Sequence, residues 1–209
     1  MKASLRPDFS AQVGLLIEHI AHTMPEFKHL EPSRILVVAG EARRASRATV
    51  KPLAFAGGRR HDAIGRKKPL VKVEGRRILY CVTLRPLFFR DSTPRERVAT
   101  VLHELFHISR DFDGTLEHAH THAELGRRFE SRLKPLEKRL WKYLPEALRA
   151  YFSFDGEVKV LQWLERPAGW LPGERVSHRK LYTEEHLFHG VVRLKTRKLK
   201  KKAAAVVLN

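Results

Sequence analysis

The chain has 209 residues, of which 43% are hydrophobic, so it can bury one core and carry a small appendage. Its 41 Lys and Arg against 23 Asp and Glu give a net charge of +18, and no stretch is apolar enough for a signal peptide or a membrane span. The single cysteine, Cys81, excludes an intrachain disulfide, and we expect a cytoplasmic protein that does not contact a membrane.

The first 84 residues predict one helix followed by strands. Apolar residues at helical spacing predict an amphipathic helix from Ser10 to about Met24. The segment Arg34–Ala39 is almost wholly apolar, which favours a central strand. Leu70–Val73 and Arg77–Leu84 flank the turn residues Glu74-Gly75-Arg76 and predict a β-hairpin.

A second helix is predicted from an N-terminal capping motif. Thr93 and Glu96 have the spacing of a capping box, and Pro94 stands at the first helical position, where its missing N–H is not needed. The helix is therefore predicted from Pro94 to about Ser109.

The pattern His-Glu-x-x-His lies within this helix, at residues 103–107. His103 and His107 are one turn apart, so their imidazoles can reach one Zn2+ ion, and Glu104 beside them is the candidate general base. The opposite side of the helix is predicted to face the core through Val98, Val101, Leu102, Leu105 and Ile108.

A catalytic zinc site needs a third protein ligand. Three histidines follow downstream, on a helix predicted from about Leu116 to about Leu133 by the spacing of Leu125, Phe129 and Leu133. His118 and His122 share that stripe, whereas His120 points away from it. We therefore rank the third ligand as His118, then His122, then His120. Oxygen ligands remain as alternatives at Asp111, Asp113 and Glu124.

After residue 133, prolines predict short helices, and alternating apolar and polar residues predict strands. Pro135 and Pro145 are expected to break residues 134–154 into short helices. Glu157–Leu164 and His186–Leu194 read as strands of a small β appendage that begins near residue 151.

The strongly basic run Lys195–Lys202 is the second functional signal. Together with the net charge of +18 it favours nonspecific attraction to nucleic acid through phosphate contacts. The plainer interpretation is a solvated charged tail that serves solubility.

The segment Val98–Ile108, followed by Phe112-Asp113-Gly114 and then a histidine, resembles the small zinc metallopeptidases of phage and prokaryotic genomes, which are SprT-like in style. Arg34–Val38 and Arg43–Ala48 resemble the segments that precede the zinc helix in that group, so the resemblance covers about residues 10–135. It implies His103 and His107 as zinc ligands and Glu104 as the base. It also implies a zincin-like α+β fold, in which a small sheet packs with the His-Glu-x-x-His helix and its neighbours.

The sequence thus predicts a metallopeptidase-like domain over residues 1–150 and a β-rich appendage with a basic tail over 151–209. The expected activity is hydrolysis of a protein or peptide by a zinc-activated water, with possible recruitment to nucleic acid. Candidate groups for stabilising the oxyanion are Arg110, Tyr80 and Tyr182. The alternative is a nucleic-acid-binding module with a structural or degenerate zinc site, in which Glu104 would have no use as a base. The oligomeric state is left open.

Overall fold

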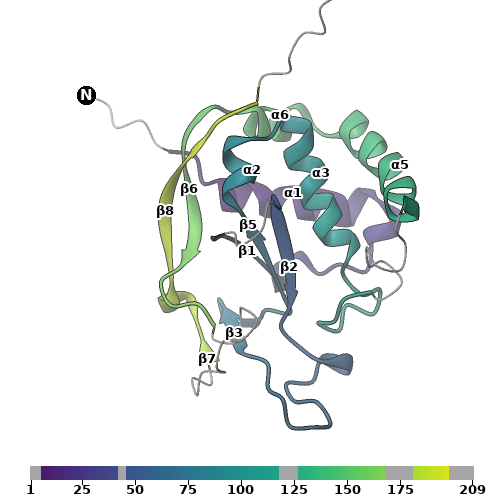
Figure 1. The fold of residues 1–209 in the computed structure, drawn as a ribbon, viewed down its shortest axis with the longest axis vertical. Helices are drawn as coiled ribbons and strands as arrows, with labels where there is room; N and C mark the ends of the chain where they lie inside the picture. The colour runs from purple at the N-terminus through teal and green to yellow at the C-terminus, as the bar shows by residue number, and fades with distance from the viewer. Residues whose placement is uncertain (1–5, 42–45, 118–126, 168–180, 198–209) are drawn as a thin grey trace, which may run out of the picture.

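The computed structural model describes residues 6–41, 46–117, 127–167 and 181–197, which form an α+β arrangement (Figure 1). Its main element is a five-stranded sheet with three parallel central strands and an antiparallel strand at each edge. In spatial order the strands are β2 (Ala48–Pro52), β5 (Tyr80–Leu84), β1 (Ile35–Ala39), β6 (Gly156–Trp163) and β8 (Leu187–Leu194). The central strand predicted at residues 34–39 is confirmed as β1.

Helices cover one face of this sheet. The helix predicted near the N-terminus is confirmed as α1, and it packs with α3 and α6 over the sheet. The helices are α1 (Phe9–Thr23), α2 (Pro86–Arg90), α3 (Pro94–Phe106), α5 (Arg127–Tyr143) and α6 (Glu146–Ser153).

Strand β1 is buried along its whole length because both of its faces are covered. Ile35, Val37 and Ala39 face the main hydrophobic core that holds α1 and α3. Leu36 and Val38 face the other way, into a smaller hydrophobic cluster. The main sheet thus has one heavily covered face and one lightly covered face.

A second, three-stranded sheet lies at the smaller cluster. The turn of the predicted hairpin is confirmed, since Glu74 and Gly75 adopt φ values of 50° and 73°, as a tight hairpin turn requires. The predicted second strand is only partly right, because residues 80–84 leave the hairpin and join the main sheet as β5. The strands are β4 (Arg76–Arg77), β3 (Leu70–Val73) and β7 (Leu181–Tyr182), and short 3-10 turns occur at Pro25–Phe27, Pro32–Arg34, Ala56–Gly58 and Glu184–His186.

The helix predicted to start near Leu116 and the break predicted at Pro135 need correction. Leu116 is not helical and instead forms a β-bridge with Ile108. Helix α5 continues through Pro135, because the loss of one backbone hydrogen bond is outweighed by its buried apolar face. That face includes Phe129 and Leu133, as predicted, whereas Leu125 lies outside the described residues. The break at Pro145 is confirmed, since α6 begins directly after it.

The strands expected in a separate C-terminal appendage belong to the main sheet. Strand β6 pairs with β1, and β8 pairs with β6 along its full length. The boundary expected at residue 150 falls inside α6, and the buried guanidinium of Arg97 on α3 donates to the Phe152 carbonyl at 2.7 Å. One sheet and one core therefore continue across that boundary.

Cys81 is fully buried on β5, and burial raises the pKa of its thiol to about 12, as suits a core residue. Among the described helices, none has both the length and the apolar character that a bilayer crossing requires.

Candidate metal centre

Helix α3 begins with the predicted cap. The Thr93 side chain accepts a hydrogen bond from the Glu96 N–H at 3.2 Å, and the Glu96 carboxylate accepts one from the Thr93 N–H at 2.7 Å. Pro94 occupies the first turn. The helix ends at Phe106, slightly earlier than predicted, and His107 follows as its C-terminal cap. The cap fixes where the helix starts and so which side chains share a face.

The two histidines lie together on one side of α3. The Nε2 atoms of His103 and His107 are 3.3 Å apart, and both side chains are half-buried. Two nitrogens bound to one zinc at about 2.0–2.1 Å in tetrahedral geometry are separated by about 3.3–3.4 Å. The pair therefore fits a single zinc ion. The predicted core arc is also confirmed, since its members are all buried: Val98, Val101, Leu102, Leu105 and Ile108.

Within the described ranges, no group of three His, Cys, Asp or Glu side chains is placed to hold a metal ion. The expected third ligands His118, His120 and His122 lie outside those ranges, as does Glu124. Of the alternative oxygen ligands, Asp113 is engaged in hydrogen bonds within the protein. Its carboxylate accepts hydrogen bonds from the Gly57 N–H at 2.8 Å and from the Thr115 N–H and hydroxyl, which together lower its pKa.

The loop that follows α3 is held in place by Tyr80. The Tyr80 hydroxyl donates to the Thr115 carbonyl and accepts from the Gly114 N–H, each at 2.9 Å. Gly114 has a φ of 87° and packs so closely on Ala54 that a side chain would clash there. The Glu117 N–H then donates to the His107 carbonyl at 2.8 Å. The chain is thus returned to the end of the histidine helix at residue 117.

Phe129 of α5 covers the two imidazoles. Its ring stacks on that of His107, with centroids 5.0 Å apart, and lies tilted against His103 at 4.9 Å. Phe129 is itself buried. Helix α5 therefore restricts the orientation of both histidine rings, which favours a preformed pair.

Glu104 is buried between α3 and the edge strand β2, with a relative exposure of 7%. Burial raises the pKa of its carboxyl to about 7, while a hydrogen bond from the Val50 backbone and the positive charge of Arg85 act in the opposite direction. A carboxyl with a pKa near neutrality can both accept and return a proton, which is the requirement for a general base.

A cavity of about 630 Å³ opens beside His103 and Glu104. We call it the acidic cleft, because its lining carries more carboxylates than cations. Its cation, Arg47, pairs with Glu96 at 3.3 Å. The full set of charged groups along its wall is Arg47, Asp91, Glu96, Glu104 and Glu137.

The side chains expected to stabilise an oxyanion lie elsewhere. Tyr80 is fully buried, and its hydroxyl is hydrogen-bonded to the loop that follows α3. Tyr182 is buried in the smaller cluster, where its ring contacts that of Trp163. Arg110 lines a different cavity. The cation that does border the acidic cleft is Arg47. Arg47 belongs to the segment Arg43–Ala48, and no local pattern in the sequence marks it as a site residue, because only the fold brings β2 beside α3.

The described part of the chain thus defines an α+β protein with a histidine pair suited to a metal and a buried carboxylate next to a cleft. A family model described as "Putative phage metallopeptidase" matches residues 9–135, which is more than half of the chain and includes all of α3. The chain belongs to this family, which indicates a metal-dependent peptidase. No curated protein matches the chain, and no solved structure matches it.

Proposed function

We propose that this protein is a zinc-dependent peptidase in which His103 and His107 hold the metal and Glu104 is the general base. The observation that carries the proposal is the 3.3 Å separation of the two Nε2 atoms, on a helix that also places Glu104 at the cleft. Imidazole nitrogens suit zinc, whereas magnesium and calcium prefer oxygen ligands.

His118 is the proposed third ligand. The hydrogen bond from Glu117 to His107 returns the chain to the histidine helix one residue before His118. This contact supports His118 over His122 and His120, which follow further along the chain.

A bound zinc ion would lower the pKa of a water molecule and polarise the substrate carbonyl. The chain's own residues supply the proton transfers. Glu104 accepts the proton from the attacking water and returns it to the leaving amine, while the Val50 N–H keeps the carboxylate in place. Phe129 holds the two imidazole rings. Arg47 at the cleft is the proposed cation for the developing oxyanion.

The proposed substrate is an extended segment of protein or peptide. Strand β2 is an edge of the main sheet, and Ser46, Arg47 and Ala48 line the acidic cleft at its beginning. An edge strand offers unpaired backbone groups, so an extended peptide can align along it. Such binding would present a backbone carbonyl to the histidine side of the cleft.

The proposal is tested with the purified full-length protein and an unfolded protein substrate such as reduced casein. We expect about one zinc per chain by elemental analysis, and hydrolysis that stops with a chelator and returns with zinc but not with magnesium. Cleavage that persists after the metal is removed, or a protein that takes up no zinc, would refute it.

The acidic cleft also predicts a preference for basic side chains in the substrate. Asp91 and Glu96 are engaged by Arg197, whereas Glu137 has no ion pair among the described residues. Glu137→Gln should lower kcat/KM for peptides with Lys or Arg near the scissile bond by about two- to fivefold, and leave neutral peptides unchanged. Glu146→Gln, on the exposed side of α6, is the matched control. An equal loss for both kinds of peptide would show that Glu137 does not select the substrate.

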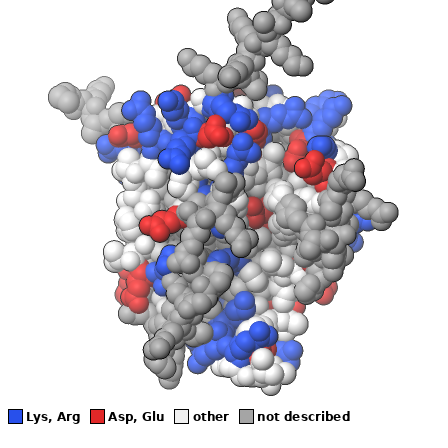
Figure 2. Space-filling model, viewed as in Figure 1, with Lys and Arg blue, Asp and Glu red and all other residues white. Residues whose placement is uncertain are grey.

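Recruitment to nucleic acid is the second part of the proposal. It is supported by the net charge of +18 and by the Lys and Arg side chains that gather across the end of the molecule where α6 lies, with a second group at the opposite end (Figure 2). The basic run from Lys195 lies mostly outside the described residues. If the protein binds zinc and nucleic acid but hydrolyses no peptide, the binding-module alternative holds instead.

A further inference from the structure

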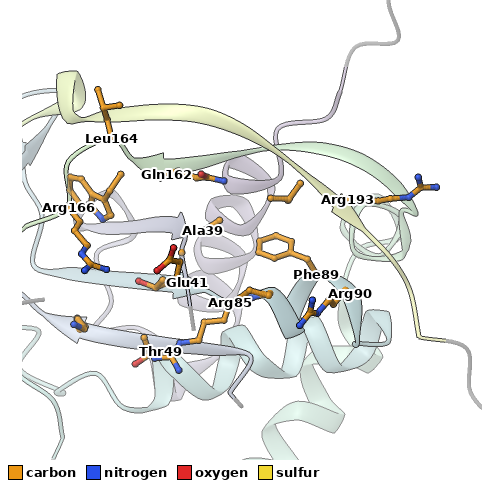
Figure 3. A pocket seen from close by; sticks show the side chains of 16 residues that line it. Ala39, Glu41, Thr49, Arg85, Phe89, Arg90, Gln162, Leu164, Arg166 and Arg193 are labelled. Carbon is orange, nitrogen blue, oxygen red and sulfur yellow. The ribbon is translucent and has the colours of Figure 1, made fainter. Parts of the chain in front are cut away.

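A second cavity, of about 750 Å³, lies where the parallel strands β1 and β5 end (Figure 3). Its floor includes Thr49 and Thr83, on the lightly covered face of the main sheet, and its walls come from α2, β6 and β8. It is separate from the acidic cleft: successive residues of β2 border the two, with Ala48 at the cleft and Thr49 at this cavity.

The charge of this cavity is opposite to that of the acidic cleft. Its lining has five cations and one carboxylate, Glu41. We call it the cationic trough, after its cations Lys51, Arg85, Arg90, Arg166 and Arg193. Arg85, Arg90 and Arg193 have no carboxylate at ion-pair distance within the part of the chain that the structure describes. Uncompensated cations in a concave site concentrate positive potential there.

The cations are spread along the trough rather than gathered at one point. Arg166 lies at one end, Arg85 near the middle, and Arg90 and Arg193 at the other end (Figure 3). A single small anion cannot contact groups at both ends. A chain of regularly spaced phosphates can, because each phosphate meets a different cation.

We propose that the cationic trough binds the phosphate backbone of a single nucleic-acid strand. A single strand is flexible enough to follow a concave floor, whereas a duplex is stiff and presents its phosphates on a convex surface. The carboxylates of the acidic cleft disfavour phosphates, whereas the cations of the trough attract them. This inference rests on the proposed attraction to nucleic acid and is independent of the proposed peptidase activity.

Arg85 connects the two sites. It lines the trough, donates to the Ser46 hydroxyl, and its charge acts on Glu104. A strand held in the trough therefore lies directly behind β2, whose other side borders the acidic cleft. This placement would favour proteins bound to the same strand as peptidase substrates.

Fluorescence anisotropy with a labelled oligothymidylate tests the proposal on the full chain. Arg90→Gln/Arg193→Gln removes two exposed cations from the trough, so affinity should fall roughly tenfold at low salt and the salt slope by about 1.4, from two contacts at about 0.7 each. The control Arg132→Gln/Lys138→Gln removes the same charge from the exposed side of α5 and should weaken binding less than about twofold.

Equal losses in the two double variants would overturn the proposal, because the binding would then follow overall charge. Duplex bound as tightly as the single strand would also overturn it. Inorganic phosphate that competes as well as a long oligonucleotide would identify a free phosphate site instead. Circular dichroism checks that the variants fold. The assay needs no hydrolysis, so its failure leaves the peptidase proposal standing, and an inactive peptidase leaves this one standing.

Discussion

Replacing Glu104 by glutamine is expected to lower peptide hydrolysis by about 10²–10⁴-fold while zinc stays bound. Glutamine keeps the shape of the side chain and can still accept the hydrogen bond from Val50, but it cannot take up a proton. Because burial already disfavours the charged carboxylate, the neutral amide should not lower the melting temperature. Steady-state kinetics, elemental analysis and thermal unfolding measure the three quantities.

Glu130→Gln, an exposed position on α5, is the matched control and should keep wild-type kinetics. If Glu104→Gln hydrolyses peptides at the wild-type rate, Glu104 is not the base. If the Glu104→Gln variant also loses zinc, Glu104 is needed for metal binding. The loss of activity would then come from the missing metal rather than from the missing base.

His103→Ala and His107→Ala are each expected to abolish stoichiometric zinc binding. Removing one of three protein ligands leaves a site with two, which is too weak to retain the ion against a competing chelator. The two variants should behave alike, because their Nε2 atoms lie 3.3 Å apart and fit the same ion. Zinc is measured by competition with a chromogenic chelator, and His22→Ala on the exposed side of α1 is the control.

The same zinc-competition measurement can identify the third ligand. Among single alanine substitutions of His118, His120 and His122, we expect only His118→Ala to lose zinc. Full zinc occupancy in His103→Ala would show that the His-Glu-x-x-His pattern is a coincidence. Loss of zinc from His122→Ala alone would identify His122, four residues further along the chain, as the third ligand.

Local features of the fold could be read from the sequence. The capping box of Thr93 and Glu96 fixed the start of α3, and the i, i+4 spacing placed His103 and His107 on one face. The apolar run of β1 marked the centre of the sheet. Each of these depends on residues close together in the chain, so short-range geometry decides them.

Features that depend on contacts between distant segments could not be predicted from the sequence. Pro135 is tolerated because Phe129 and Leu133 keep α5 packed on the core, and β6 joins β1 although more than a hundred residues separate them. Neither the tolerance of Pro135 nor the pairing of β6 with β1 is visible in the local sequence. Both depend on tertiary packing, whose energy can override the local preference of a residue for helix or strand.

The histidine pair, its glutamate and the excess of positive charge were therefore determined by the sequence alone. The surroundings of these groups were decided by the tertiary structure. Burial against β2 raises the pKa of Glu104, α5 brings Phe129 onto the imidazoles, and strand pairing separates the acidic cleft from the cationic trough. The reason is physical: the spacing of two histidines is set by one helix, whereas burial, charge contrast and a cavity arise only when several elements pack together.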